Sequence, residues 1–198
     1  MQAPLVISFF TAGTPYELEA QRLRQSCTEL NIEHVIDAQP SGGTWARNCA
    51  MKGPFVCAQL EQLRRPVLWI DADATVMRPL DCLAELRCDL ACYVRWPAPN
   101  QPPGLDSSYM PFMSGTVYFA FSPGGRRAAQ LWATYCRAYS TLLDQECLAL
   151  AWWDLRRELS FHLLPQGFCK VFDQAWLESS HDTYILHHQA SRRLGRLV

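Results

Sequence analysis

Two short apolar runs with an amphipathic helix between them open the chain, and this order restricts the fold more than any other feature. Residues 5–10 are rich in residues that favour strands. Thr14 and Pro15 suit the start of a helix, and Glu17 stands where a capping box has its acid. Apolar residues then recur at helical spacing, and residues 34–36 have the pattern of a second strand. Such a start predicts a parallel sheet with right-handed crossovers.

The remaining elements follow from further apolar runs and turn signals. Strands are predicted at 66–70, 90–94, 116–121 and 184–187, helices at 128–139 and 144–153, and a turn at 122–125. Residues 45–63 are predicted to be helical with an interruption at Gly53-Pro54, since proline disfavours the helical conformation in the residue before it. No domain boundary is visible, so we expect residues 1–198 to form a single α/β domain.

A proline-rich segment interrupts this pattern at 96–111. It contains five prolines, so we expect no regular structure there. Loops of this length in a compact domain are usually functional or disordered. We interpret the segment as a mobile flap beside the active site, with a simple surface excursion as the alternative.

Composition excludes several classes of protein. Hydrophobic residues make up 49% of the chain and charged residues 19%, which permits a sizeable core and argues against disorder. The net charge of -1 argues against general electrostatic binding to DNA or acidic membranes. The nine cysteines contain no C-x-x-C pair, which is typical of reduced, buried thiols. No signal peptide and no apolar run of about 20 residues is present, so we expect a cytoplasmic protein without a membrane span.

Two aspartates follow the apolar run that ends at residue 70. Ligands of open α/β sheets gather at the carboxyl ends of strands, so Asp71 and Asp73 are expected at a binding site. Alternation points both side chains to roughly the same side, where they repel one another unless a cation intervenes. Oxygen-rich sites of this kind suit Mg²⁺ or Mn²⁺, completed by water and substrate phosphates. Aspartate is also a common turn residue, and a merely solvated pair is the alternative.

The sequence resembles the nucleotide-diphospho-sugar transferases of the GT-A fold, which carry an Asp-x-Asp turn after a core strand. The resemblance rests on the order and spacing of short motifs: 7–11, Tyr16-Glu17, Trp45, Asn48, Lys52-x-Pro54-Phe55-Val56, 68–73, 114–119, Asp144-Gln145-Glu146 and His187-His188. It implies a Rossmann-like α/β/α sandwich with a mostly parallel central sheet. It also implies a metal-dependent glycosyltransferase that moves a sugar from a nucleoside diphosphate sugar to an acceptor hydroxyl.

The resemblance further implies roles for individual residues. Asp73 would bind the metal, and Asp71 would contact the ribose or a metal-bound water. Thr11 and Tyr16 would lie against the base. The remaining implied positions are Lys52 near the sugar or phosphate, Ser114 and Gly115 in the donor-sugar pocket, Asp144 near the acceptor or the sugar hydroxyls, and His187 as a third metal ligand.

Several details stay open at this point. Only one of His187 and His188 can face the metal by strand alternation, and the sequence does not decide which. Arg192 and Arg193 would add charge-assisted bonds to the phosphates, with a solvated basic tail as the alternative. Asp144 is a candidate catalytic base if the enzyme inverts, alongside Asp71 in the catalytic set.

The substrates are defined only in part. The resemblance favours a UDP-sugar donor and retention of the anomeric configuration. The acceptor is open among a glycan, a protein, a small molecule and a modified nucleic-acid base. Trp45 and Trp69 are interpreted as core residues rather than sugar platforms.

Two rival functions use the same residues. Residues 70–76 are similar to the first motif of haloacid-dehalogenase-type phosphatases, in which Asp71 would be the nucleophile and Asp73 the general acid/base. Two predicted strands precede the motif here, and no second acidic pair for Mg²⁺ follows residue 100, which disfavours this reading. The other rival is a non-catalytic nucleotide-sugar binding module that has lost turnover.

Overall fold

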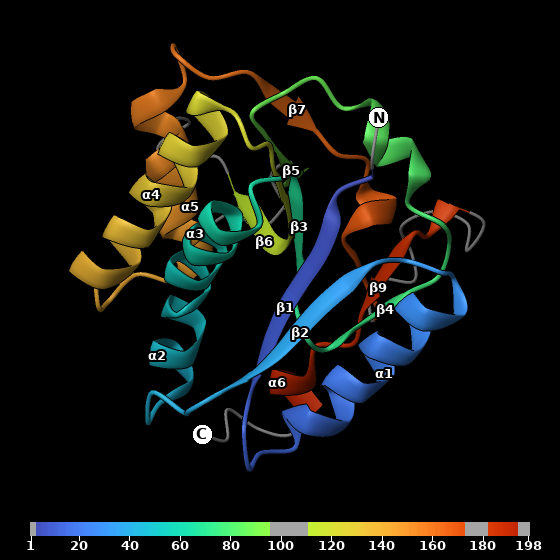
Figure 1. The fold of residues 1–198 in the computed structure, drawn as a ribbon. Helices are drawn as coiled ribbons and strands as arrows, with labels where there is room; N and C mark the ends of the chain where they lie inside the picture. The colour runs from blue at the N-terminus through green and yellow to red at the C-terminus, as the bar shows by residue number, and fades with distance from the viewer. Residues whose placement is uncertain (1–2, 96–110, 173–181, 194–198) are drawn as a thin grey trace.

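The computed structural model describes residues 3–95, 111–172 and 182–193 (Figure 1). The proline-rich segment expected at 96–111 lies, apart from Pro111, outside the described residues. Its two ends meet, because the backbone N–H of Arg95 donates to the carbonyl of Pro111.

A six-stranded sheet in the order β2-β1-β3-β6-β5-β7 forms the centre of the fold. Its strands are β1 (Leu5–Thr11), β2 (His34–Gln39), β3 (Val67–Ile70), β5 (Leu90–Val94), β6 (Phe112–Phe119) and β7 (Phe161–Leu163). The β1–β2, β1–β3 and β5–β7 pairs are parallel, and β6 runs antiparallel to β3 and β5. The sheet confirms the predicted α/β fold. Strand β6 begins four residues earlier than predicted, so Ser114 and Gly115 lie inside it.

Helices cover both faces of this sheet. They are α1 (Tyr16–Glu29), α2 (Trp45–Ala50), α3 (Lys52–Leu63), α4 (Pro123–Ala138), α5 (Asp144–Leu155) and α6 (Ala190–Arg193), with 3₁₀ turns at Asp81–Glu85 and Gln166–Phe168. In Figure 1, α3, α4 and α5 lie on one side of the sheet and α1 lies on the other. Alternate residues of β3 divide between the two cores, since Trp69 packs with the α3–α5 side and Leu68 with the α1 side. Its uninterrupted apolar run is typical of a strand that is buried on both faces.

A second sheet of three short strands lies on the α1 side. It consists of β4 (Ala74–Val76), β9 (Ile185–His187) and β8 (Lys170–Val171), in the order β4-β9-β8. Strand β4 pairs antiparallel with β9, which places Ala74 opposite His187. The pairing brings the end of the described chain to the turn that follows β3.

Helix α1 begins close to where the sequence predicted, but its cap differs in detail. The hydroxyl of Thr14 accepts from the backbone N–H of Tyr16 at 3.3 Å. The carboxylate of Glu17 accepts from the backbone N–H of Gly13 at 2.6 Å, one residue before the position that a standard capping box uses.

Two predicted boundaries are wrong for related reasons. The helical segment 45–63 breaks at Met51 rather than at Gly53-Pro54. Pro54 lies in the first turn of α3, where its missing N–H has no partner to lose. The predicted turn at 122–125 is instead the start of α4. There Ser122 is the N-cap, accepting from the N–H of Gly125 at 3.0 Å, and Pro123 is the first helical residue.

Within the parts of the chain that the structure describes, every helix is too short or too polar to span a bilayer. The nine cysteines are free thiols, and five of them are buried. The prediction of buried thiols therefore holds for these five, whereas three others are partly buried and Cys82 is exposed.

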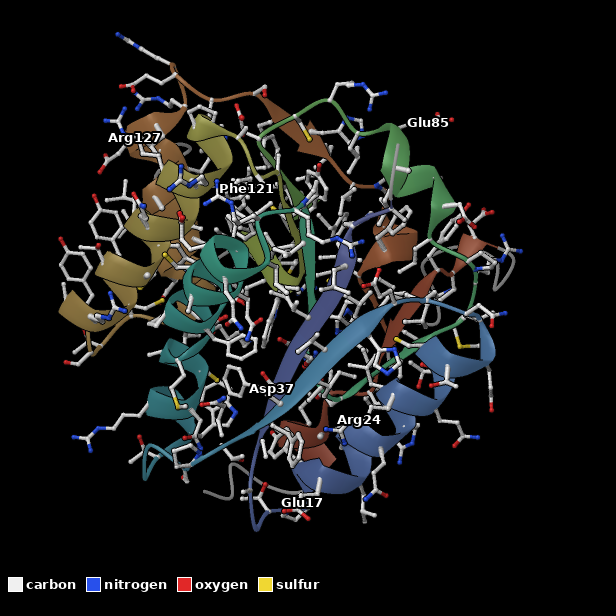
Figure 2. The ribbon with its side chains drawn as sticks, in the orientation of Figure 1. Glu17, Arg24, Asp37, Glu85, Phe121 and Arg127 are labelled. Carbon is white, nitrogen blue, oxygen red and sulfur yellow. The ribbon has the colours of Figure 1, made fainter. Side chains whose placement is uncertain are left out.

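The contact between α3 and α4 holds the helical layer that carries Lys52 at its edge. At one end lies Phe121, which is labelled in Figure 2. The guanidinium groups of Arg64 and Arg126 lie over its ring, at 5.5 and 5.2 Å from the ring centre. Arg126 also forms two hydrogen bonds of 2.7 Å with Glu61. At the other end, Gly53 packs against the backbone of α4.

Gly53→Ala tests this close approach. An added methyl would lie 3.1 Å from Cα and N of Ala133 and 3.1 Å from Sγ of Cys136, so the backbone of α4 would have to shift by a few tenths of an ångström. Alanine would otherwise stabilise a helix, so we expect a net loss of about 1–2 kcal/mol in the free energy of unfolding. Gln62→Ala on the exposed side of α3 is the control, with a change within about 0.5 kcal/mol. Urea unfolding measures both, and an unchanged or higher midpoint for Gly53→Ala would contradict the packing described.

Candidate active site

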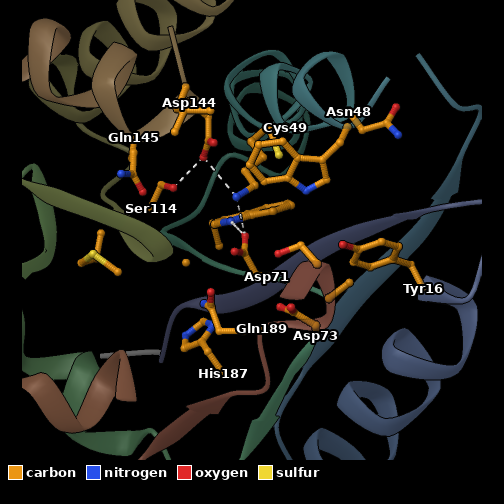
Figure 3. Close-up of a pocket in the computed structure, with 18 of the residues that line it drawn as sticks. Tyr16, Asn48, Cys49, Asp71, Asp73, Ser114, Asp144, Gln145, His187 and Gln189 are labelled. Atoms are coloured by element: carbon orange, nitrogen blue, oxygen red, sulfur yellow. Dashed lines mark hydrogen bonds and ion pairs between the residues drawn. The ribbon is translucent and has the colours of Figure 1, made fainter. Parts of the chain in front are cut away.

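A cavity of about 450 Å³ opens at the carboxyl ends of β1 and β3 (Figure 3). The sheet edge is the one expected to bind ligands in open α/β folds. Ten of the residues singled out in the sequence line it: Thr11, Tyr16, Lys52, Asp71, Asp73, Ser114, Gly115, Asp144, His187 and Arg192. Arg193 is the last residue of α6, and its side chain lies outside the described residues.

One part of the cavity holds a group of potential metal ligands. Asp71, Asp73 and His187 each offer one atom, and these atoms all lie within 4.8 Å of one another. Asp71 follows β3, Asp73 precedes β4 and His187 ends β9, so the β4–β9 pairing is what assembles the group. Ligands on opposite sides of a Mg²⁺ ion lie about 4 Å apart, so the group has the size that such an ion needs.

Asp73 is held in a buried position by the segment after β9. Its side-chain oxygen Oδ2 accepts from the backbone N–H of Ala190 at 2.7 Å, and its carbonyl accepts from the N–H of His188 at 2.9 Å. Burial and the nearby carboxylate of Asp71 raise the pKa of Asp73 to about 6. A carboxylate in this environment is stabilised by a cation, which its other oxygen, Oδ1, can bind.

His187, rather than His188, is the histidine of this group. Its Nε2 lies 3.0 Å from the hydroxyl oxygen of Thr116, whereas His188 contacts the hydroxyl of Thr75 at 2.8 Å. Burial lowers the pKa of His187 to about 4, so the imidazole is neutral near pH 7, the form that binds metals. Gly115 makes room for the ring, because a methyl group there would lie 2.9 Å from its Cε1.

A second group of polar side chains lies beside the first (Figure 3). The ammonium of Lys52, the first residue of α3, lies 2.8 Å from Oδ1 of Asp71 and 3.0 Å from Oδ2 of Asp144. Ser114 donates to the same Oδ2 at 2.5 Å. Burial by itself would lower the pKa of Lys52, but the carboxylates of Asp144 and Asp71 raise it well above its usual range. Lys52 therefore stays charged and bridges the two acids.

The charges of the cavity suit a metal ion together with a diphosphate. Three carboxylates, those of Asp71, Asp73 and Asp144, and two basic groups, those of Lys52 and Arg192, line it, which is a net charge of -1 among the described side chains when all are ionised. A divalent cation would make the site net positive and so able to attract a dianionic ligand.

Aromatic side chains border the cavity near the end of β1. Tyr16 opens α1, and burial together with the charge of Asp73 raises the pKa of its phenol to about 12. Trp45 opens α2, whose start is fixed by the hydroxyl of Thr44 accepting from Arg47. Trp45 is only partly buried and lines the cavity, so its interpretation as a core residue is wrong.

Sequence reasoning missed several lining residues. Trp69 is 1% exposed, as a core residue should be, yet its indole N–H donates to Asp71 at 3.0 Å. Gln189 lies next to the histidines with a φ of 51°, a left-handed conformation that is uncommon for glutamine. Cys169 reaches the cavity from beside β8. Only Gln189 had a signal in the sequence, its position directly after the histidine pair.

Solved structures share this architecture at low sequence identity. A glycosyltransferase involved in the glycosylation of the major capsid of PBCV-1 has a TM-score of 0.72 and 12% identity over 98% of this chain and 97% of its own. The glycosyltransferase GlyE of Streptococcus pneumoniae TIGR4 has a TM-score of 0.60 and 14% identity, over 94% of this chain and 55% of its own. Mouse xyloside xylosyltransferase 1 has a TM-score of 0.54 and 12% identity, over 96% and 99%.

Comparison by sequence adds no relative, since no family model and no curated protein matches the chain. At identities of 12–14% the structural similarity establishes the fold. The GT-A-like α/β fold implied by the sequence resemblance is therefore confirmed.

The two adjacent histidines provide a matched test of the metal group. His187→Gln should weaken Mn²⁺ binding at least about tenfold, because it replaces an imidazole in the group, whereas His188→Gln should leave it within about threefold. Titration followed by the electron paramagnetic resonance of unbound Mn²⁺ measures both affinities. Equal losses in the two variants, or none in His187→Gln, would contradict the assignment.

Proposed function

We propose that this protein is a metal-dependent glycosyltransferase that moves a sugar from a nucleoside diphosphate sugar, expected to be a UDP-sugar, to an acceptor hydroxyl. The observation that carries the proposal is the arrangement of two polar groups in one cavity. The Asp71–Asp73–His187 group suits a cation, and the Lys52–Asp144–Ser114 group beside it suits a sugar.

Asp71, Asp73 and His187 would hold Mn²⁺ or Mg²⁺. Two carboxylates and one neutral imidazole form a suitable donor set for these ions. When bound, the ion supplies Lewis-acid stabilisation of the negative charge that develops on the leaving diphosphate, worth several kcal/mol. Arg192 lines the same cavity and would add charge-assisted hydrogen bonds to the phosphates. Arg193 is assigned the same role from its position in the sequence.

Asp144 would bind the donor sugar. Its described contacts with Lys52 and Ser114 both involve Oδ2, so Oδ1 can accept a hydrogen bond from a sugar hydroxyl. The indole N–H of Trp132 donates to the backbone carbonyl of Asp144 at 2.8 Å and fixes the start of α5. These contacts orient the carboxylate before the donor arrives, which favours sugar binding over the role of a mobile base. Gly115 lines the same cavity, and the ring of His187 fills the space that a side chain at this position would take.

Tyr16 and Thr11 would border the nucleoside. Tyr16 offers a neutral aromatic surface, and the hydroxyl of Thr11 is held 3.0 Å from that of Thr14. Trp45 adds a second aromatic ring to the lining. Uridine as the base and retention of the anomeric configuration rest on the sequence resemblance, and the acceptor stays open.

A thermal-shift screen of nucleoside diphosphates tests the proposal. We expect UDP with Mn²⁺ to raise the Tm by roughly 5–10 °C at about 100 times its Kd, and EDTA to abolish the shift. Asp73→Asn should lose the shift, because an uncharged amide replaces the buried carboxylate that would bind the cation. Glu158→Gln removes an exposed acid that does not line the cavity and should retain the shift. Stabilisation that survives EDTA, or no response to any nucleoside diphosphate, would contradict the proposal.

Activity assays separate the rival functions. We expect slow hydrolysis of the preferred nucleotide sugar without an acceptor, lowered at least about 100-fold in Asp73→Asn. Robust hydrolysis of an aryl phosphate with Mg²⁺ that is lost in Asp71→Asn would establish the phosphatase instead. Tight UDP binding without hydrolysis or transfer would establish the binding module.

A further inference from the structure

The indole of Trp69 donates a hydrogen bond to Asp71, one of the proposed metal ligands. It lies in β3 two residues before Asp71, and its side chain is 1% exposed. Its Nε1–H donates to Oδ1 of Asp71 at 3.0 Å. The one hydrogen-bond donor of this buried indole therefore binds a carboxylate at the edge of the cavity. Trp69 has a polar contact with the site in addition to its packing in the core.

The same carboxylate oxygen has a second donor. Lys52 lies 2.8 Å from Oδ1 of Asp71, so both described side-chain donors of Asp71 converge on one oxygen. The acceptor directions of Oδ1 are thereby occupied, and Oδ2 is the oxygen left for a cation.

The two donors differ in how firmly they are held. The ring of Trp69 packs against Phe9 and Phe55, with ring centres 5.4 and 5.9 Å away, and those two rings pack on each other at 5.2 Å. These neighbours come from β1 and α3, so the indole is fixed from two elements. Lys52 reaches Asp71 at the end of a four-carbon side chain and shares its charge with Asp144, so its contact with Asp71 also depends on that second carboxylate.

We infer that Trp69 is a positioning residue for Asp71, whose carboxylate it orients so that Oδ2 faces the cation; this rests on the proposed function. The indole N–H keeps that orientation when Lys52 shifts toward a bound donor. When the N–H is removed, Lys52 is the remaining described side-chain donor to Asp71. The orientation of the carboxylate then depends on the position of the lysine. Partners of this kind that orient a metal ligand typically change metal affinity 10–100-fold.

Trp69→Phe tests the inference in the full chain. The variant keeps an aromatic ring between Phe9 and Phe55 and deletes the N–H donor. Trp152→Phe is the matched control, since Trp152 packs against Phe112 and Phe161 and does not line the cavity. With Mn²⁺ alone as the probe, we expect affinity about tenfold weaker or more in Trp69→Phe and unchanged in Trp152→Phe.

A double-variant comparison separates positioning from a general structural effect. In an Asp71→Asn background, Trp69→Phe should produce no further loss of Mn²⁺ affinity, because its effect passes through the Asp71 carboxylate. An equal further loss there would mean that Trp69 acts on the cavity by another route and would overturn the inference.

A measurement on the unchanged protein covers the case in which Trp69→Phe fails to fold. In ¹⁵N-labelled protein, Mg²⁺ should shift the indole N–H resonance of Trp69 and leave that of Trp152 in place. An unmoved Trp69 resonance, or unchanged Mn²⁺ affinity in a folded Trp69→Phe, would overturn the inference and leave the proposed function intact. Failure of the unchanged protein to bind Mn²⁺ would instead overturn the proposed metal site.

Discussion

Repulsion among three carboxylates that share one cavity is the constraint on which the rest of the site depends. Each carboxylate is stabilised differently. Asp73 is held by a backbone N–H, Asp144 by Ser114 and Lys52, and Asp71 by Lys52 and Trp69. The ammonium of Lys52 is shared by Asp71 and Asp144, so the three carboxylates together still favour a further positive charge. A divalent ion satisfies that requirement and also attracts a diphosphate, which links the electrostatics of the protein alone to the chemistry proposed for it.

The fold meets this constraint by using the ends of rigid elements. The first residue of α3 supplies Lys52, the first residue of α5 supplies Asp144, and the last residue of β9 supplies His187. Residues at such positions are oriented by packing and by the sheet ladder rather than by loops. The small sheet has only short strands, yet it is what places His187 beside the turn after β3.

Much of this was predictable from the sequence, and the rest was hidden for identifiable reasons. The β-α-β start and the buried strand β3 could be predicted because their apolar runs, although short, are clearly bounded by turn residues and charges. Strands β4 and β8 have three and two residues, which are too few for a periodic signal in the sequence. Which of His187 and His188 faces the metal group is therefore decided only by the β4–β9 register. The start of α4 has the pattern of a turn because serine, proline and glycine begin helices as readily as they form turns. Burial of Trp69 was predictable, but the direction of its N–H depends on packing between three elements.

Crystals grown with UDP and Mn²⁺, with data collected at the manganese edge, would locate the cation relative to the three side chains. We expect one strong anomalous peak within about 2.3 Å of oxygens of Asp71 and Asp73 and of a nitrogen of His187, with the diphosphate next to it. A diphosphate bound without manganese, or manganese bound elsewhere while the three side chains keep their positions, would contradict it.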